Sequence, residues 1–429
     1  MYTKQAGVAR YLCCLPARNA QSGWRGVGRN AGRAPALWIA AVLLLLLSAP
    51  VHATNGFELV GYSPVSKGLA GAGSALPMDS SWSITNPAGI ATLDRRFDQA
   101  LSFYTVHRTL EPHGLAANPF PDKLVDDHPI GGGDTGIVWP GKHVVFAAGF
   151  YSMFGLTTNY SEPRSIVPLL TLRRWDNHLN MYGVRIPFTA AKRLGDGWSL
   201  GVSLNLNLQT MTSDHLTLKL RETAGQKDYS FSYGFGLTFG VLKEWKRFSL
   251  AAAYSTPQWM TPYEEYKDLF PRSFDYPQKL QLGLAVHVTK KLALALDYKW
   301  LNWAGVPQFG RSIVKNGLGW DDQHVIKGGL YYELSKRWAV MCGASYAKTP
   351  MDDNQVFVHG LAPLIISTHV CAGLGYRINE HHELTCAYTL FVPNSKTERG
   401  QGDIFGFLGK GTKITASAHS LSLGYSYYF

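Results

Sequence analysis

The chain lacks any long apolar run and is poor in charge and in cysteine. Of its 429 residues, 17% are charged and five are cysteines. No stretch of 18 or more apolar residues occurs, so we expect no helix that crosses a membrane. Acidic residues are absent from the first 53 positions, although the chain contains 30 in total. These absences exclude a helical membrane protein and a small disulfide-stapled fold, and they set the first 53 residues apart.

The acid-free segment has the pattern of a secretory signal peptide. Six basic residues precede an apolar run at 36–49, and Val51-His52-Ala53 follows as an A-x-A-like cleavage site. We therefore predict a signal peptide over residues 1–53 and a mature chain that begins at Thr54. Without this segment the net charge falls from +11 to +5, so the basic composition does not indicate nucleic-acid binding.

What the mature chain does contain is alternation of apolar with small or polar residues. The alternation covers residues 200–209, 229–241, 280–288, 292–300 and 421–429. A period of two is typical of a strand with one apolar face. A soluble β-sandwich also has such strands, but these segments reach about ten residues, the length that a tilted strand needs to cross a bilayer. The pattern predicts an all-β fold, a transmembrane antiparallel β-barrel of about 14 strands.

Residues 54–95 do not alternate and are rich in Gly, Ala, Ser and Pro. They include the run Gly68-Leu69-Ala70-Gly71-Ala72-Gly73 and a turn at Asn86-Pro87-Ala88-Gly89. A segment of this composition cannot build a core of its own. Because the barrel is predicted to start directly after it, we expect the segment to fill the lumen as a plug, or hatch. The predicted organisation is signal peptide 1–53, hatch 54–95 and barrel 96–429.

In this order the segments resemble the FadL/TodX family of outer-membrane transporters for hydrophobic compounds. The matching stretches are 68–75, Asp79 and 86–89 in the hatch, and 154–158, 296–300, 320–322 and 425–429 in the barrel. The resemblance extends over essentially all of residues 55–429. It implies a protein of the bacterial outer membrane that takes up hydrophobic molecules passively, long-chain fatty acids first and aromatic hydrocarbons as the alternative.

The resemblance also implies a route. A cargo lands between extracellular loops, enters an apolar pocket and leaves sideways beside a kinked third strand after the hatch shifts. The expected hatch residues are Gly71, Gly73, Asn86, Pro87 and Ala88. The residues expected at the lateral opening are Phe150, Phe154 and Gly155, since glycine weakens strand pairing. The alternatives are an ordinary Asx-Pro turn at the hatch and interfacial aromatic residues at a strand end.

Two further sets of residues are candidates for contact with the cargo. The aromatic residues expected to form the landing surface are Trp259, Tyr263 and Tyr266. The candidate head-group contacts are Arg185, Lys299 and Lys327, which fall on the inward faces of their strands. Alternatively, these cations form ion pairs in a wet lumen, such as Lys299 with Asp297 or Lys327 with Glu333.

Two other classes of protein stay open, a general porin and an outer-membrane hydrolase. A hatch argues against an open pore, and no motif fixes a hydroxyl near His287 or His369, so we expect no enzyme and no catalytic residue. His381, His382 and Glu383 lie at a short turn, where solvent is expected to surround them, so no metal or other cofactor is predicted. The expected partners are the hydrophobic cargo, the lipid bilayer, lipopolysaccharide and the outer-membrane assembly machinery, for a monomer that binds no nucleic acid.

Overall fold

The computed structural model describes residues 57–116, 123–160, 177–213, 229–267 and 270–429. The predicted signal peptide and its cleavage site lie outside these residues. Fourteen long strands occur in the described part of the chain. They are β1 (Arg96–Glu111), β3 (Pro129–Pro140), β4 (Val145–Tyr160), β5 (Asn177–Gly195), β6 (Trp198–Ser213), β7 (Ser230–Glu244), β8 (Phe248–Ser255), β10 (Lys279–His287), β11 (Leu292–Leu301), β12 (Gln323–Glu333), β13 (Trp338–Ala347), β14 (Thr368–Arg377), β15 (His382–Thr397) and β16 (Lys413–Tyr428).

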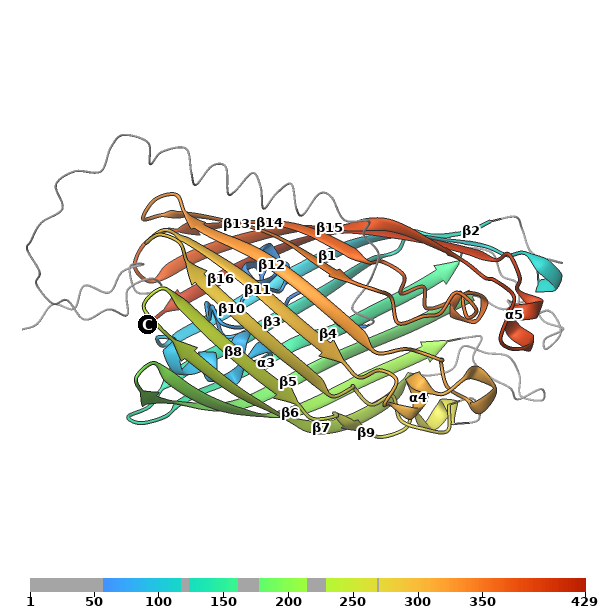
Figure 1. Ribbon diagram of the computed structural model, residues 1–429, viewed down its shortest axis with the longest axis horizontal. Coiled ribbons are helices and arrows are strands. Elements are labelled where there is room, and N and C mark those ends of the chain that lie inside the picture. The colour runs from blue at the N-terminus through green and yellow to red at the C-terminus, as the bar shows by residue number, and fades with distance from the viewer. Residues whose placement is uncertain (1–56, 117–122, 161–176, 214–228, 268–269) are drawn as a thin grey trace, which may run out of the picture.

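The long strands form one closed antiparallel barrel (Figure 1). Each pairs with its neighbours in chain order, and β16 pairs with β1, which joins Leu423 to Leu101. Two short strands, β2 (Leu124–Asp126) and β9 (Trp259–Met260), add to β1 and β7. The predicted barrel of about 14 strands is confirmed.

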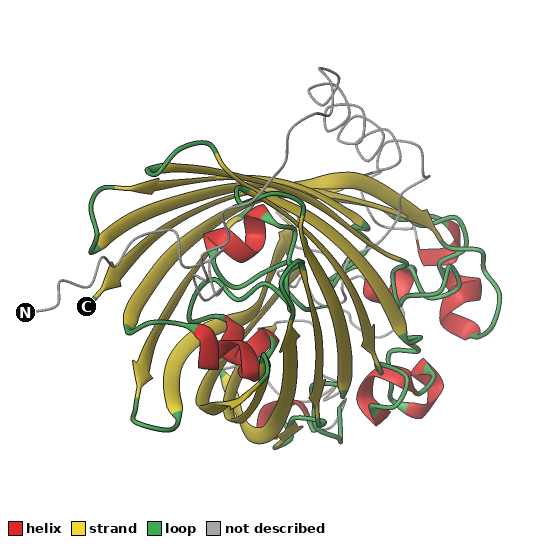
Figure 2. Ribbon diagram, turned by 60° about the vertical axis from the view of Figure 1, so that its left-hand side comes forward, coloured by secondary structure: helices red, strands yellow, loops and turns green. Residues whose placement is uncertain are grey.

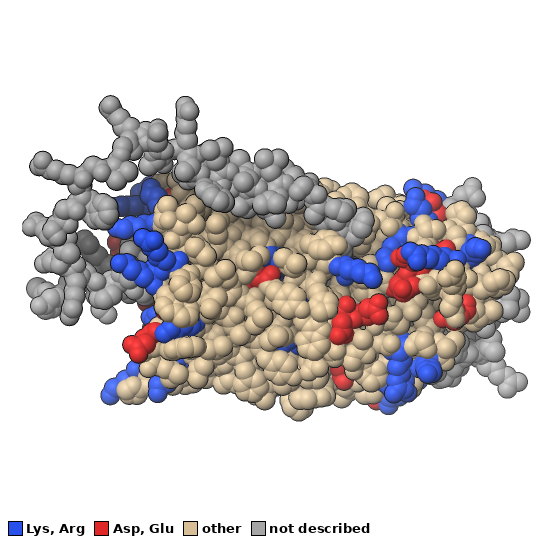
Figure 3. Space-filling model, in the orientation of Figure 1, with Lys and Arg blue, Asp and Glu red and all other residues tan. Residues whose placement is uncertain are grey.

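The wall of the barrel is apolar outside and polar inside. On β6, the outward Leu200, Leu204 and Leu206 are 42% to 47% exposed, whereas the inward Ser203 and Asn205 are 0% exposed. The middle of the wall visible in Figure 3 carries few charged side chains, and both ends carry many. This arrangement matches a surface that faces lipid. Among the described residues, no helix is long and apolar enough to cross a membrane.

The two ends of the barrel differ (Figure 1). The short-turn end has tight connections, such as those after β5 and β10, and the C-terminus lies there. The opposite, long-loop end has longer connections that contain short helices. These helices are η3 (Gly114–Ala116), η4 (Glu264–Tyr266), α4 (Pro307–Gly310), η5 (Ile313–Lys315), η6 (Phe357–His359) and α5 (Ile404–Leu408).

The hatch lies inside the barrel, where Figure 2 shows its short helices surrounded by strands. These helices are α2 (Pro64–Gly68), α3 (Trp82–Thr85) and η2 (Pro87–Thr92). Two of them start with proline, whose fixed backbone angle suits the first helical turn. Leu69, Trp82 and Ile90 are at most 1% exposed, in a core shared with small inward residues of the wall. The hatch therefore fills the part of the lumen near the short-turn end.

Two strands include residues that do not look like strand in the sequence. β3 begins at Pro129, ahead of three glycines, and β16 begins at Lys413, ahead of the alternation over 421–429. The first part of β3 contains three successive glycines, which are depleted in strands and therefore indicate a loop. In the fold this part pairs with β1, so tertiary pairing overrides the local preference.

Candidate functional site

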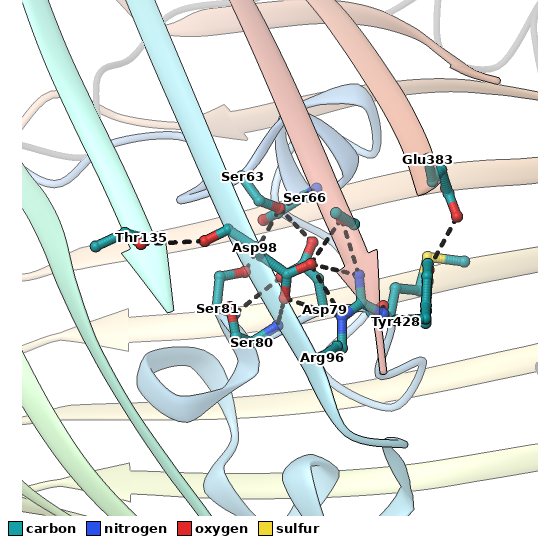
Figure 4. A network of polar contacts seen from close by, with 12 residues as sticks. Ser63, Ser66, Asp79, Ser80, Ser81, Arg96, Asp98, Thr135, Glu383 and Tyr428 are labelled. Carbon is teal, nitrogen blue, oxygen red and sulfur yellow. Dashed lines mark hydrogen bonds and ion pairs between the residues drawn. The ribbon is translucent and has the colours of Figure 1, made fainter. Parts of the chain in front are cut away.

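A buried polar network fixes the hatch to the first strand near the short-turn end (Figure 4). The N–H of Ser80 donates to Asp98 Oδ2 at 2.9 Å. Arg96 pairs with Asp98 at 2.6 Å and donates to the carbonyl of Met78 at 2.5 Å. Because both charged residues belong to β1, the barrel wall itself supplies the anchor for this part of the hatch.

The predicted hatch turn Asn86-Pro87-Ala88 lies directly against β6 and β7. The side chain of Asn86 caps η2, and its amide group donates to the carbonyl of Val241 at 3.2 Å. A Cβ atom added at Gly201 or Gly240 would lie 2.3 Å or 2.1 Å from this turn. Only glycine allows so close an approach of the wall to the hatch.

The other two predicted hatch residues also lie against the wall. Gly71 and Gly73 have φ angles of 73° and 105°, which favour glycine. The N–H of Gly73 donates to Asp297 Oδ1 on β11 at 2.8 Å. A Cβ atom at Gly71 would lie 2.6 Å from Lys327 Nζ on β12. The structure thus gathers all five predicted hatch residues inside the barrel, while their part in gating stays a prediction.

The hydrogen-bonded ladder between β3 and β4 is interrupted. Pairing covers residues 135–140 of β3 and 145–150 of β4 and then stops, although both strands continue. Residues 129–134 of β3 stay paired with β1, and β4 continues along β5. We call the unpaired stretch between residues 129–134 and 151–156 the lateral opening.

A cavity of about 280 Å³ lies behind the lateral opening. Its walls come from hatch residues 57–60, from β1, β3, β4 and β5, and from loop residues before β14. Phe57, Tyr104, Ile130 and Phe154 are among the apolar and aromatic side chains of the lining. A cavity of this kind can hold a small hydrophobic molecule or part of a longer chain.

The structure places all three residues predicted for the lateral opening beside it. Phe150 is the last residue of β4 that pairs with β3, and its outward ring is 43% exposed. Phe154 follows a bulge in β4 and turns inward to Phe57, with ring centroids 5.4 Å apart. A Cβ atom at Gly155 would meet Ile130 across the opening at 3.3 Å. The role of these residues in transport remains a prediction.

At the lateral opening, some backbone N–H and C=O groups have no partner on the neighbouring strand, and side chains supply their hydrogen bonds instead. The N–H of Ser152 donates to Asp134 Oδ1 at 2.8 Å, and Ser152 Oγ donates to the carbonyl of Gly133 at 3.0 Å. Lipid offers no hydrogen bonds, so an opening in a membrane wall requires such substitutes. Asp134 is 5% exposed and therefore serves the opening from inside the wall.

A buried cluster of charges lies at the inner end of the cavity. Glu58 of the hatch accepts from Lys279 Nζ at 2.6 Å and from Lys299 Nζ at 2.7 Å. Burial opposes the charged form of Glu58, but the two lysines outweigh it and hold the pKa of this carboxyl well below its usual range. Lys327 Nζ donates to the carbonyl of Val60 at 3.3 Å. The lysines of β10, β11 and β12 thus hold hatch residues 58–60.

All three predicted head-group cations face the lumen, and the two ion pairs named as examples of the alternative do not form. Lys299 pairs with Glu58 rather than with Asp297, which instead binds N–H groups of the hatch. Lys327 lies in the middle of β12 and Glu333 at its end, so they are too far apart to pair. Arg185 donates to the neutral Asn207 at 2.7 Å. The alternative of lumen ion pairs holds for Lys299, with a different partner.

The predicted landing residues do not share one exposed surface. Trp259 is 47% exposed on the outer wall and packs against Phe235 with ring centroids 5.6 Å apart. Tyr263 and Tyr266 are 0% exposed and belong to the core that closes the long-loop end. Spacing along a loop does not separate an exposed aromatic ring from one buried under its neighbours, so a common landing surface stays without structural support.

Sequence reasoning missed Glu58, Lys279 and Asp134, and the glycine run 131–133. Two of these carried a signal. Glu58 is the first acidic residue of the chain, which marks it as a partner for lumen cations. Three successive glycines between strand-like segments indicate weak pairing. Lys279 and Asp134 carried none, because their role depends on partners from other elements.

Neither a metal site nor a hydrolytic site is evident in the described residues. In these ranges, no three His, Cys, Asp or Glu side chains are placed to hold a metal ion. Ser345 Oγ lies 3.0 Å from His369 Nδ1 beside the cavity, the nearest approach to a hydrolase pair. No carboxylate of the described chain hydrogen-bonds to His369, so the pair lacks the group that would orient a catalytic base.

Comparison with known proteins gives a family match for part of the chain. Residues 271–429 match the sequence model of a family described as outer membrane protein transport protein (OMPP1/FadL/TodX). No curated protein matches the sequence. The family match covers the barrel from the connection before β10 to its last strand.

Solved structures share the fold over most of the chain. The chain is similar to the toluene transporter TodX of Pseudomonas putida, with a TM-score of 0.68 and 16% identity over 87% of this chain and 99% of that chain. The toluene transporter TbuX of Ralstonia pickettii gives a TM-score of 0.64 and 18% identity, over 87% and 100% of the two chains. A FadL homologue of Pseudomonas aeruginosa gives 0.64 and 15%, over 87% and 100%. Identities this low establish the fold alone; with the family match, they confirm the resemblance predicted from the sequence.

Proposed function

We propose that this protein is a non-enzymatic channel of the bacterial outer membrane for hydrophobic compounds, of the FadL/TodX type, and that it releases its cargo sideways through the lateral opening. The partial family match and the shared fold support the first part of this proposal. The observation that carries the proposal is the interrupted ladder between β3 and β4 in front of an apolar cavity. Continuous pairing at this seam would separate the cavity from the lipid.

Lateral release suits a hydrophobic cargo. The free energy of such a molecule falls by about 25 cal/mol per Å² of apolar surface when this surface leaves water. Release into the bilayer preserves this favourable free energy, whereas release into the periplasm would expose the apolar surface to water again. Passive uptake therefore needs no energy source. A general porin requires an open lumen, and here the hatch occupies it.

We infer that the long-loop end faces the outside and that a short arm of the hatch controls the cavity. Residues 57–60 close its inner end, through the packing of Phe57 on Phe154 and the ion pairs of Glu58. The anchors of the hatch body on β1, β7 and β11 are separate contacts. A shift of the arm alone would therefore enlarge the cavity while the hatch body stays in place.

Long-chain fatty acids are the cargo that we propose first. The cavity offers apolar contact for an acyl chain, and the lysine cluster behind it offers cations for a carboxylate. Glu58 now occupies that place, and a fatty-acid carboxylate would compete with it. The cationic cluster would give no advantage to a hydrocarbon without a charged group.

Monoaromatic hydrocarbons are the second candidate. The fold is shared with two toluene transporters. Phe57, Tyr104 and Phe154 line the cavity, and aromatic rings pack favourably on one another. This reading makes the lysine cluster a device for holding the hatch rather than for binding cargo.

Lateral release can be tested by filling the opening from one side of β3. Gly132 faces the cavity, where a Cβ atom would meet Ser152 Oγ at 3.1 Å; at Gly328, on the lipid side of β12 and away from the opening, a Cβ atom would meet nothing within 4 Å. Gly132→Leu should therefore remove most uptake of labelled palmitate or toluene by cells that make the protein. Gly328→Leu should leave uptake unchanged, and both should migrate as folded barrels. Equal uptake by the two variants would contradict lateral release.

The cargo can be tested separately. Mass spectrometry of lipid extracted from the purified protein should find bound fatty acid. Lys299→Met should lower uptake of palmitate more than uptake of toluene, because only palmitate carries a carboxylate. An equal loss for both probes would favour the aromatic-hydrocarbon reading.

A further inference from the structure

A buried arginine bounds the lateral opening at its long-loop side. Arg108 of β1 is 6% exposed and pairs with Asp126 of β2 at 2.8 Å. The same guanidinium nitrogen donates to the carbonyl of Thr157 and to Thr158 Oγ1, the latter at 3.1 Å. Arg108 therefore ties β1 and β2 to β4 across the line where the ladder would have continued.

The surroundings hold this tie in place. The side chain of Asp126 is 0% exposed, and its second oxygen lies 2.6 Å from His128 Nδ1. Beyond Thr158, Tyr160 donates to the carbonyl of Gly360 at 2.8 Å, which fixes the end of β4 to the long-loop core. A buried ion pair adds little stability compared with apolar side chains but can impose one geometry.

The opposite end of the opening is held by Asp134, which binds the N–H of Ser152. Between the two ties, β4 runs from Ser152 to Thr157, roughly 17 Å at about 3.3 Å per residue. Along this stretch β3 presents glycines at 131–133 and so leaves the space unfilled. The lateral opening is thus a slot whose two ends are set by side chains and whose edge is bare backbone.

We propose that Arg108 and Asp134 are positioning residues that fix the width of the lateral opening, and that this width selects hydrophobic molecules by girth. An acyl chain or a single aromatic ring passes, and a broad fused-ring hydrocarbon does not. The inference rests on the proposed lateral release and adds to it a determinant of selectivity. Because both ends are tied, β4 cannot move away from β3 along the whole seam.

The test removes the contacts of Arg108 with β4 and does not leave a buried charge without its partner. Arg108→Met combined with Asp126→Leu replaces both partners by apolar residues of similar size. Arg108→Lys is a milder variant, since it keeps a charge facing Asp126, but its shorter side chain does not bring a nitrogen to the place where Arg108 Nη1 meets both Asp126 and Thr157. The matched control is the same double change at another ion pair, Arg377 with Glu383, which lies away from the opening.

The readout is the ratio of pyrene uptake to palmitate uptake in cells that make each variant. We expect this ratio to rise several-fold in the Arg108→Met/Asp126→Leu variant, less in Arg108→Lys, and not at all in the control pair. A loss of folded protein lowers both uptakes together and leaves the ratio unchanged. Adding Gly132→Leu to the double variant should remove the gained pyrene uptake.

Two failures can be told apart. A folded double variant with the wild-type ratio would overturn the role of Arg108 in setting the width. If Gly132→Leu alone leaves palmitate uptake intact, lateral release itself fails, whatever the double variant does.

Discussion

Two seams of the same barrel wall are built in opposite ways. The β1–β16 seam closes the cylinder with 16 consecutive residue pairs, over 96–111 and 413–428. The β3–β4 seam has six pairs, over 135–140 and 145–150, and is then unpaired. Both join antiparallel strands in one closed sheet, so strand direction and position in a sheet do not explain the difference.

The side chains differ between the two seams. At the closed seam Leu101 faces Leu423 on the lipid side, and the hydroxyls of Ser102 and Ser422 lie 2.9 Å apart on the lumen side. At the open seam β3 offers only glycines at 131–133. Cross-strand side-chain pairs stabilise a sheet, and glycine provides none. A membrane wall can therefore be opened locally by omitting side chains on one strand, provided that other side chains satisfy the freed backbone groups.

Removal of the hatch should have the largest effect, and it should affect the two seams differently. The described hatch elements take no part in the strand ladder, so a chain without residues 57–92 should still close between β1 and β16. The lateral opening would lose its inner wall, which residues 57–60 form, and the lumen would lose its filling. We expect a barrel that migrates as folded and shows a large rise in conductance in planar bilayers. Conductance as low as that of the full chain would mean that the hatch is not the barrier.

A charge on the closed seam should have the next largest effect. Leu423 is 48% exposed on the lipid side, and arginine at mid-membrane depth destabilises a barrel by about 2–4 kcal/mol. Leu423→Arg should therefore lower the free energy of unfolding, measured with denaturant in lipid vesicles, far more than Leu423→Ala. The alanine variant loses apolar surface without gaining a charge. If the two were equally stable, this seam would not face lipid.

A change at the edge of the open seam should have a smaller effect. Asp134→Ala leaves the N–H of Ser152 without its acceptor, at a cost of about 1–3 kcal/mol, while Asp134→Asn keeps an acceptor oxygen. At the closed seam, carbonyl groups of the paired strand accept the hydrogen bonds of the backbone N–H groups. Ser420→Ala there should change little, because the Ser420 hydroxyl has no partner among the described residues. An equal loss of unfolding free energy for Asp134→Ala and Asp134→Asn would argue against this account.

The contrast also shows how much of the fold could be predicted from the sequence. The closed seam was predictable because alternation along 421–429 is a property of one strand and assigns its faces directly. The open seam belongs to two strands brought together, and residues 129–134 resemble a loop until β1 pairs with them. Glycine in this stretch predicts weak pairing, but the sequence does not indicate whether the pairing with β1 or the pairing with β4 is missing.

The candidate site divides in the same way. Parity along a strand placed Lys299 and Lys327 in the lumen correctly, since it needs only local spacing. The carboxylate that pairs with Lys299, Glu58, is 241 residues away along the chain, and nothing local links the two. Tyr263 and Tyr266 failed as a landing surface for a related reason, because the burial of a loop residue depends on what the other loops place above it.

The smallest expected effect is a pH dependence at the outer end of the open seam. His359 is 1% exposed. Its Nε2 accepts from Trp320 Nε1 at 2.9 Å, and its Nδ1 lies 2.6 Å from the carbonyl of Gln355, so the buried ring is neutral with the proton on Nδ1. Burial lowers the pKa of His359 from 6.5 to about 4. The next residue, Gly360, accepts the hydrogen bond by which Tyr160 holds the end of β4.

When the loop opens, His359 takes up a proton more readily than it does in the closed loop. The neutral ring therefore contributes its full stabilisation above about pH 6.5. This stabilisation is lost progressively as the pH falls from 6.5 to about 4. Amide hydrogen exchange of residues 355–360 and 157–160 should become faster over this range, relative to a His359→Gln variant measured at each pH. Exchange in the short-turn half of the closed seam, residues 96–103 and 421–428, should not follow, because these residues lie at the other end of the barrel from this histidine. If both seams loosened together, or if His359→Gln kept the pH response, the anchoring of β4 through this loop would have to be abandoned.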